Sequence, residues 1–498
     1  MQAKNIGTRS PFKMARKIKL DIRAILIAIT LIQVAIGAAL VLAQAPADPV
    51  VGDPGVGDPY FPRLGNGGYD TLHYDIELTI DVDGNMITGE TRIEAVALQA
   101  LSAFNLDFQA LDIASVQIDG ADADYTHADG ELTITPPQPF TLGQTFSARV
   151  VYSGEPGGYP FKQTIADLGW YDLDEAVAAL GEPAGSSTWY PVNEHPSDKA
   201  TYTFRLTAPV PYTAIANGVL EETIAGDENN TYVWQMRQPM ASYLTLLAVG
   251  DYAALTEDPT ADGIPVRNYA PTDVIDRARA SFAPTADIID GFSELFGDYP
   301  FEAVGGVVVP AFLGFALETQ SMPVYDFTML LSPPDSSEYL IAHELAHQWF
   351  GNSVSPASWQ DIWLNEGFAT YASWLWYEIS DREAEFDRIM RSSYVGLLGM
   401  GRSRRDTDVV TGDPGADDLF NGSVVYTRGA LTLHALRLTI GDDAFFETLR
   451  TYYERYKFGV AATADFIAVA EEVSAQDLSD FFDAWLYSAE LPELPLSE

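Results

Sequence analysis

Two histidines and a glutamate in the stretch HELAHQWFGN are spaced for metal-assisted hydrolysis. His343 and His347 are four residues apart, so on a helix both imidazoles project from one face, one turn apart. Two imidazole nitrogens at that separation can bind a single zinc ion. Glu344 is offset by about 100° around the helix, which suits a general acid and base beside the metal rather than a ligand.

A further acidic residue completes this set. Glu366 follows His347 with eighteen residues between them, in LNEGFATYASWLWYE, at the start of a second apolar helix. If that helix folds back, its carboxylate becomes the third ligand, and a zinc ion held by two histidines and one glutamate keeps a fourth position open, as in hydrolytic zinc sites. We therefore expect one zinc ion per chain. The alternative is a helix whose histidines are merely capped or buried.

The elements that must position these residues follow from the hydrophobic periodicity. In HYDIELTIDVDG apolar and polar residues alternate up to the turn at Asp83 and Gly84, which predicts a half-buried strand. Similar short runs recur, and they predict a β-sandwich or a saddle of twisted sheets over residues 69–257. From Asp258 the spacing becomes helical, and the helix carrying the histidines is expected to run to Gly351. The predicted fold is thus α+β and multidomain, with a mixed but mostly helical second domain over residues 258–490.

Composition excludes several classes of function. The 498 residues include no cysteine, so disulfides, cysteine catalysis and thiolate-bound zinc are excluded, and a metal site must use His, Asp and Glu. The formal net charge of −43 has the wrong sign for a nucleic-acid partner. It indicates a strongly hydrated acidic surface, or alternatively a surface that steers cationic substrates.

The N-terminus is a separate unit. Several basic residues between Lys4 and Arg23 precede an apolar run from Ala24 to Ala43. A basic segment followed by an apolar one is typical of an export signal or a membrane anchor, so residues 1–43 predict a signal peptide or an N-terminal anchor, and the choice between them stays open. Either one places the rest of the chain outside the cytoplasm. Residues 44–68, rich in Pro, Gly and Asp, are expected to be a solvated linker.

The sequence resembles the aminopeptidase N family of zinc aminopeptidases. HELAHQWFGN followed by WLNEGFATY carries the resemblance, together with LHYDIELTIDVDGNMITGETRI and TWYPVNEHPSDKATYTFRLTAP, so that residues 70 to 490 are covered. The resemblance implies a saddle-like β domain followed by a thermolysin-like catalytic domain. Larger family members continue into a long C-terminal helical domain for which this chain, ending at Glu498, has no room, and we expect a more open cleft.

The same resemblance implies a substrate site. The family motif Gly-x-Met-Glu-Asn matches FALET, residues 315 to 319, in which Glu318 would bind the free α-amine of a peptide and Ala316 would also contact substrate. Phe315, Leu317 and Thr319 replace the glycine, the methionine and the asparagine of the motif. Counting back nine residues from Pro191 places a second amine-binding carboxylate at Glu182. In GSVVYTRGA, Tyr426 occupies the position whose hydroxyl stabilises the oxyanion, followed by Arg428 in place of the family's lysine.

These residues predict a zinc aminopeptidase that acts on peptides with a free N-terminus. Two carboxylates facing a buried ammonium each offer a charge-assisted hydrogen bond, whereas the neutral N–H of a peptide interior would leave them unpaired. Two alternatives remain open. A thermolysin-like endopeptidase would cleave N-acetylated peptides and tolerate the loss of Glu318, and a non-catalytic peptide-binding module would lack the ligands or the base that this chain retains.

Overall fold

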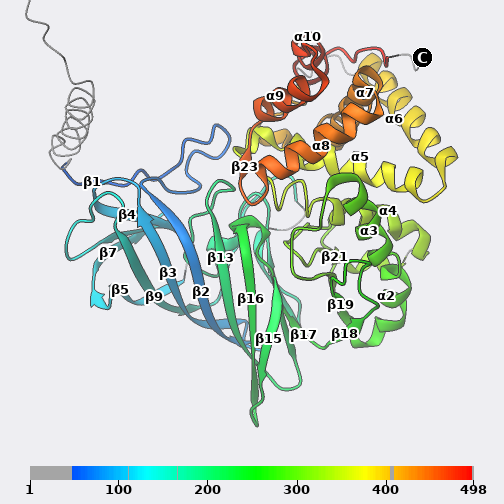
Figure 1. Ribbon diagram of the computed structural model, residues 1–498. Helices are drawn as coiled ribbons and strands as arrows, with labels where there is room; N and C mark the ends of the chain where they lie inside the picture. Colours follow the sequence, from blue (N-terminus) through cyan, green and yellow to red (C-terminus); the bar gives the residue numbers. More distant parts are fainter. Residues whose placement is uncertain (1–47, 110, 165–166, 332, 404–408, 496–498) are drawn as a thin grey trace, which may run out of the picture. The chain divides into compact units, whose positions relative to one another are not determined.

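A large twisted sheet forms the frame of the β-rich half (Figure 1). Two of its long strands, β2 and β3, form a hairpin joined at residues 82–85, as the Asp83–Gly84 turn predicted. In β2, Ile76 and Leu78 are buried while Glu77 between them is exposed, because successive side chains of a strand point to opposite faces. The sheet runs in the order β15-β16-β13-β2-β3-β9-β5-β6, with bounds β2 Tyr69–Asp81, β3 Met86–Ala97, β5 Asp112–Ile118, β6 Ala121–Asp122, β9 Thr145–Gly154, β13 Lys199–Pro209, β15 Val219–Ile224 and β16 Asn229–Ala241.

The structure is a computed structural model that describes residues 48–495 apart from 110, 165–166, 332 and 404–408. The predicted signal peptide or anchor, residues 1–43, lies outside the described residues. From Pro49 onward the chain forms one compact unit. None of the described helices combines the length and apolar character that crossing a bilayer requires.

Two smaller sheets complete the β-rich half. The four-stranded sheet β1-β4-β8-β7 comprises β1 Val50–Val51, β4 Leu101–Asp107, β8 Glu131–Thr135 and β7 Asp124–Ala128. The five-stranded sheet β10-β11-β12-β17-β14 comprises β10 Gly158–Tyr159, β11 Leu168–Asp172, β12 Val177–Leu180, β17 Leu247–Gly250 and β14 Thr213–Ala216. Strand β12 is buried along its whole length, and the chain leaves it directly into the loop that carries Glu182.

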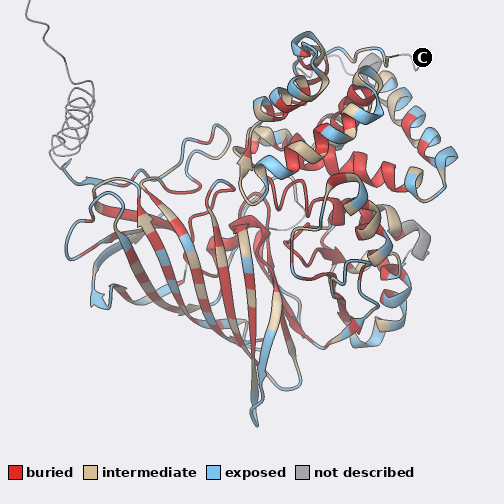
Figure 2. Ribbon diagram, viewed as in Figure 1, coloured by how far each residue is buried: buried red, intermediate tan, exposed pale blue. Residues whose placement is uncertain are grey.

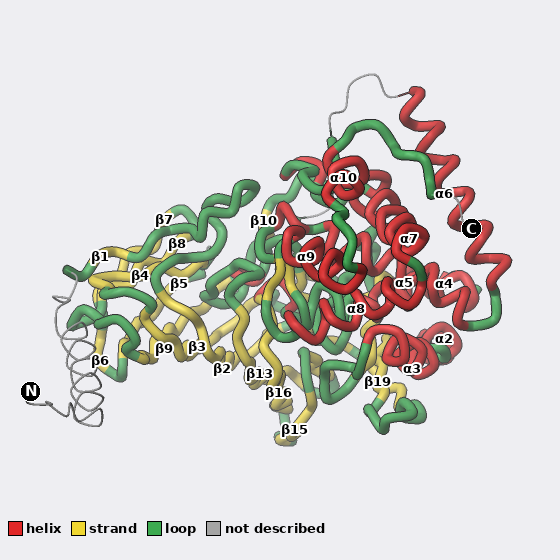
Figure 3. The backbone as a smooth tube through the Cα atoms, turned by 45° about the horizontal axis from the view of Figure 1, so that its top comes forward, coloured by secondary structure: helices red, strands yellow, loops and turns green. Residues whose placement is uncertain are grey.

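The second half combines a small sheet with helices that gather on one side of the molecule (Figure 3). The sheet, in the order β18-β19-β20-β21, comprises β18 Tyr252–Thr256, β19 Val266–Pro271, β20 Val304–Val309 and β21 Val324–Asp326. The helices are α2 Ile275–Phe282, α3 Thr285–Phe296, α4 Pro334–Ala346, α5 Trp363–Ile379, α6 Glu383–Ser403, α7 Arg428–Ile440, α8 Asp442–Tyr456, α9 Thr463–Ser474 and α10 Ser479–Phe482. A short pair, β22 Ser355–Pro356 and β23 Val460–Ala461, joins the loop after α4 to the segment before α9. The predicted order, a β-rich domain followed by a mostly helical one, is confirmed.

Helix α4 ends earlier than predicted. It stops at Ala346, and the residues up to Gly351 leave the α-helix. The backbone N–H groups of Asn352, Ser353 and Val354 donate to carbonyls five residues back, at 2.9, 3.2 and 3.1 Å. This wider turn satisfies carbonyls of the helix end, and the periodicity of the apolar residues does not reveal it.

The segment expected to be a solvated linker is docked against the rest of the molecule. Strand β1 pairs in parallel with β4. Asp58 is buried, and its carboxylate accepts hydrogen bonds from the backbone N–H of Trp359 at 2.9 Å and from Ser358 Oγ at 3.0 Å. The Pro, Gly and Asp composition indicated a turn-rich segment but could not indicate these contacts, which involve residues 300 positions away. Figure 2 shows that buried residues continue from the β-rich half into α4 and α5, where the functional residues lie.

Candidate functional site

Helices α4 and α5 bring the three predicted metal ligands together. His343 lies in the last turn of α4, His347 caps its C-terminus, and Glu366 lies in the first turn of α5. The Nε2 atoms of the two histidines are 3.1 Å apart, and Glu366 Oε2 lies 3.1 Å from His343 Nε2 and 3.5 Å from His347 Nε2. All three side chains are buried.

These distances fit a zinc site. Ligand atoms at about 2.0–2.2 Å from a tetrahedral zinc ion are about 3.3–3.6 Å from one another, close to the separations found here. The other ring nitrogen of His347, Nδ1, lies 3.1 Å from the carbonyl oxygen of Phe350. Donation of Nδ1–H to this carbonyl leaves the Nε2 lone pair facing the other two ligands, which is how metal-binding histidines are usually oriented. The donor set of two imidazoles and one carboxylate therefore fits zinc.

The electrostatics of the pocket favour a cation. Burial alone would lower the pKa of His347, but the carboxylates of Glu318 and Glu366 outweigh it and raise that pKa to about 10. Burial likewise would raise the pKa of Glu366, whereas His347 and His343 lower it to about 2. Since a metal ion must displace the proton from an imidazole, metal binding competes with this protonation.

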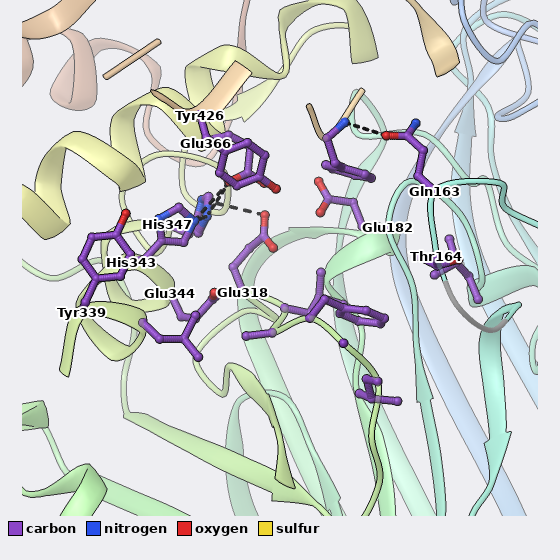
Figure 4. A pocket seen from close by; sticks show the side chains of 18 residues that line it. Gln163, Thr164, Glu182, Glu318, Tyr339, His343, Glu344, His347, Glu366 and Tyr426 are labelled. Atoms are coloured by element: carbon purple, nitrogen blue, oxygen red, sulfur yellow. Dashed lines mark hydrogen bonds and ion pairs between the residues drawn. The ribbon is translucent and has the colours of Figure 1, made fainter. Parts of the chain in front are cut away.

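Glu344 lines the pocket beside the ligand set (Figure 4). Its carboxylate is buried, and burial raises its pKa well above the ordinary value. Glu344, Glu318 and His347 each place a donor atom within 4.8 Å of the others. The pocket has a volume of about 410 Å³, and residues from both halves of the chain line it, among them Leu168, Phe315 and Phe420.

Tyr426 enters the pocket from the other side. It lies in the π-helical turn Gly422–Thr427, a rare geometry that is frequent at functional sites. Its ring stacks on that of His343 with centroids 5.9 Å apart and planes inclined by 9°. Burial, followed by the nearby carboxylate of Glu366, raises the pKa of the Tyr426 hydroxyl well above its usual value, so that the hydroxyl is a proton donor at neutral pH.

Arg428, which replaces a lysine of the family pattern, faces away from the pocket and fastens the C-terminal segment. Its guanidinium donates to the carbonyls of Trp485 at 2.9 Å, Ala484 at 3.1 Å and Ser488 at 2.6 Å. A planar guanidinium donates several hydrogen bonds in fixed directions, whereas a lysine ammonium is a single point charge on a flexible stem. Because Arg428 binds the C-terminal segment, its replacement of lysine leaves Tyr426 in the pocket.

Glu318 lies on a short stretch of extended chain at the edge of β21. The backbone of Leu317 exchanges two hydrogen bonds with Val324, at 2.9 and 2.7 Å. The carbonyl of Glu318 accepts from Gln348 Nε2 at 3.2 Å and from Asn352 Nδ2 at 2.6 Å. This segment is thus fastened to the residues that follow His347, and its neighbours Phe315 and Ala316 also line the pocket.

Glu182 reaches the same pocket from the β-rich half. Figure 4 shows its carboxylate pointing toward that of Glu318, and oxygens of Glu182, Glu318 and Glu366 lie within 4.8 Å of one another. The Oε1 atoms of Glu182 and Glu318 are buried and accept no hydrogen bond from the described residues. Burial, then the neighbouring carboxylate of Glu318, raises the pKa of Glu182. Two close carboxylates with oxygens that accept no hydrogen bond from the described residues make a binding place for a cationic group.

One pocket is therefore lined by all the predicted site residues, which are Glu182, Ala316, Glu318, His343, Glu344, His347, Glu366 and Tyr426. The structure also adds residues that sequence reasoning missed. Gln163, next to Glu182 in the pocket, exchanges hydrogen bonds with the backbone of Ala416 at 2.9 Å and Phe420 at 3.0 Å, and Tyr339 lines the pocket from α4. No motif marks Gln163, and only the helical spacing of Tyr339 and His343, four residues apart, could have indicated a shared face.

Comparison with known proteins places these observations in a family. A model of the peptidase family M1 domain matches residues 281–485, and a model of the peptidase M1 N-terminal domain matches residues 70–244. Aminopeptidase N of Streptomyces lividans is 31% identical over 377 residues, which cover 69% of this chain and 43% of the relative. Aminopeptidase 2 of Candida albicans is 24% identical over 449 residues, which cover 86% of this chain and 48% of the relative. The chain thus spans less than half the length of each of these relatives.

Solved structures match over a larger share of both chains. The M1 zinc metallopeptidase of Deinococcus radiodurans superposes with a TM-score of 0.81 at 29% identity, covering 89% of this chain and all of the other. A point mutant of that protein has been solved with a Tyr-Ser-Ala substrate. A structure described as a two-domain M1 zinc metallopeptidase mutant, also 29% identical to this chain, contains L-arginine.

Proposed function

Because the chain belongs to the peptidase M1 family, we propose that it is a zinc-dependent aminopeptidase that removes the N-terminal residue from peptides. The convergence of His343 Nε2, His347 Nε2 and Glu366 Oε2 at separations of 3.1–3.5 Å carries this proposal. These three side chains would hold the ion. When bound, zinc supplies a Lewis acid that polarises the scissile carbonyl and acidifies the attacking water.

Glu344 and Tyr426 supply the proton transfer and the charge stabilisation. The carboxylate of Glu344 accepts a proton from the attacking water and later delivers it to the nitrogen of the leaving amine. The raised pKa of this buried carboxylate suits both acceptance and delivery. The Tyr426 hydroxyl donates a hydrogen bond to the oxyanion that develops on the scissile carbonyl, and its stacking on His343 holds it in place.

Glu318 and Glu182 select the end of the peptide. A free α-ammonium fits between their carboxylates and pairs with the buried oxygens that have no other hydrogen-bond partner among the described residues. A peptide bound through its interior would leave both carboxylates without a cation, which is unfavourable in a buried site. Fixing the ammonium there lets only the first peptide bond reach the catalytic groups. The crowding of carboxylates in one pocket supports exopeptidase over endopeptidase activity, and the intact base and ligands argue against a binding module.

Kinetics of Glu344→Gln together with a zinc determination test this proposal. The amide keeps the shape of the side chain but cannot take up the proton, so we expect one zinc ion per chain and a loss of about 10²–10⁴ in kcat on an aminoacyl-aminocoumarin. Full activity with zinc bound would refute the assigned base. A protein that binds no zinc and still turns over would refute the metal centre.

Export is a separate proposal, which rests on the sequence alone. The basic and then apolar residues 4–43 support transfer of the rest of the chain out of the cytoplasm, with anchoring through residues 24–43 as one form of it. Cell fractionation of the full-length chain, compared with a variant that lacks residues 2–43, tests it. Equal distribution of the two chains would contradict export.

A further inference from the structure

The loop that carries Glu182 has an unusual arrangement of backbone N–H groups. The chain leaves β12 at Leu180 and turns back within Gly181–Ser187. Gly185 has a φ of 145°, and a Cβ on it would lie 2.8 Å from the backbone nitrogen of Gly169, so no other residue fits there without moving the loop. In this conformation the N–H groups of three successive residues, Gly185, Ser186 and Ser187, point to one place.

A single carboxylate oxygen occupies that place. Glu194 Oε1 accepts all three of these hydrogen bonds, at 2.7, 2.5 and 3.2 Å. Consecutive backbone N–H groups that converge in this way form a concave anion-binding nest. Glu194 is fully buried, and its backbone N–H donates to Asp107 Oδ2 at 2.9 Å, so the backbone of the residue that fills the nest is anchored to the end of β4.

The position of the Glu182 carboxylate depends on this loop. Glu182 Oε1 is buried and accepts no hydrogen bond from the described residues, so no side-chain contact of that oxygen fixes its direction. Glu318 Oε1 likewise accepts no hydrogen bond from the described residues, but the backbone carbonyl of Glu318 is tied to Gln348 and Asn352. The backbone of Glu182 lies instead in the loop 181–187, which Glu194 closes together with Ser186, whose hydroxyl donates to the carbonyl of Ser242 at 2.7 Å.

We propose that Glu194 is a positioning residue that holds Glu182 at the amine-binding end of the pocket. This inference rests on the proposed function, since it gives Glu182 a cation to bind. Glu194 does not itself line the pocket. Its loss should therefore weaken recognition of the free amine rather than the hydrolytic step.

A double-mutant cycle between Glu194→Gln and Glu182→Gln tests the coupling. The amide at position 194 retains an acceptor oxygen but loses the charge that strengthens the three hydrogen bonds. With leucyl-aminocoumarin we expect Glu194→Gln alone to lower kcat/KM by about 10- to 100-fold, mainly through KM, because displacement of a substrate-positioning group by about 1 Å has effects of this size. In the Glu182→Gln background, the same substitution should change kcat/KM by less than about threefold, because the group that it positions is already disabled.

A control variant separates positioning from stability. Asp465→Asn removes another carboxylate that accepts a backbone N–H, that of Ala462 at 2.9 Å at the start of α9, away from the lining residues of the pocket. We expect Asp465→Asn to lower the unfolding temperature without changing KM. Gly185→Ala distorts the backbone of the nest instead of the carboxylate that fills it. It should lower kcat/KM in the same way, again only when Glu182 is present, and it replaces Glu194→Gln if that variant does not fold.

The outcomes are distinguishable. An equal loss of kcat/KM from Glu194→Gln, or from Gly185→Ala, in both backgrounds would overturn the proposal, because a merely structural residue acts whether or not Glu182 is present. If Glu182→Gln alone leaves the kinetics unchanged, Glu182 does not bind the amine, and the proposal that Glu194 positions it is refuted as well. A large effect of Glu182→Gln with none from Glu194→Gln would leave the proposed function intact and refute this inference alone.

Discussion

Replacing Glu318 by glutamine should remove most of the preference for a free N-terminus. The substitution preserves the size of the side chain, and the backbone stays fastened because Gln348 and Asn352 bind the carbonyl of residue 318 rather than its side chain. The variant therefore removes the charge of residue 318 and leaves its backbone contacts in place. The nearest basic group to Glu318 Oε1 is His347 Nδ1 at 3.8 Å, too far for a hydrogen bond, so the carboxylate is available to a substrate.

The size of the effect follows from the contact that is lost. A hydrogen bond to a charged group contributes about 1.5–3 kcal/mol, and each 1.4 kcal/mol is about a factor of ten. We therefore expect kcat/KM for a peptide with a free amine to fall about 10- to 150-fold. For the N-acetylated form of the same peptide, which has no ammonium, we expect a change of less than about threefold.

The assay compares these two forms of one peptide, with product separation by chromatography. Glu338→Gln is a matched control, because Glu338 lies on the same helix as His343 but binds Arg382, at 2.7 Å, instead of lining the pocket. Its loss should lower stability and leave the selectivity between the two peptides unchanged. If Glu318→Gln keeps the selectivity of the unmodified chain, or if the unmodified chain cleaves the acetylated peptide as well as the free one, the exopeptidase reasoning is wrong and endopeptidase activity is favoured.

Three further predictions concern the oxyanion, the first side chain of the substrate and the pH dependence of stability. Tyr426→Phe keeps the ring that stacks on His343 and removes one donor, so kcat should fall about 10²–10³-fold with KM little changed; steady-state kinetics that show a fall below about threefold would contradict the role. The lining residues that the structure describes include several carboxylates and neither Lys nor Arg. Because like charges repel in a buried pocket, glutamyl-aminocoumarin should be cleaved at least about tenfold less efficiently than leucyl-aminocoumarin. Equal rates for the two substrates would refute this prediction. Burial raises the pKa of Asp198 to about 8, so between about pH 4 and 8 this residue binds more protons in the folded chain than in the unfolded one, and its contribution to the free energy of unfolding falls as the pH rises. Asp198→Asn should remove up to about 3 kcal/mol of this fall between pH 5 and 7 in urea titrations, and an unchanged pH dependence would show that Asp198 does not titrate in this way.

The metal ligands were predictable because their geometry is local. A spacing of four residues fixes the common face of His343 and His347 once a helix is assumed, and the start of the next apolar helix places Glu366. The alternation in β2 was predictable for the same reason, since a period of two needs no knowledge of distant residues.

The remaining features depend on contacts between distant parts of the chain. Glu182 and Glu318 come from different halves, and only the resemblance to known aminopeptidases predicted that they meet. The nest around Glu194 depends on the backbone conformation at Gly185, and the docking of Asp58 on Trp359 joins residues 301 positions apart. Helix α4 stops at Ala346 rather than Gly351 because of a wide turn in the backbone, to which the periodicity of side chains is insensitive.

The metal centre is tested most directly by anomalous X-ray diffraction at the zinc absorption edge, on crystals of the protein grown with zinc. We expect one strong peak per chain, bounded by His343 Nε2, His347 Nε2 and a carboxylate oxygen of Glu366, and no peak in crystals of His347→Ala. A peak at another place in the chain, or none between these three side chains, would contradict the assigned zinc site.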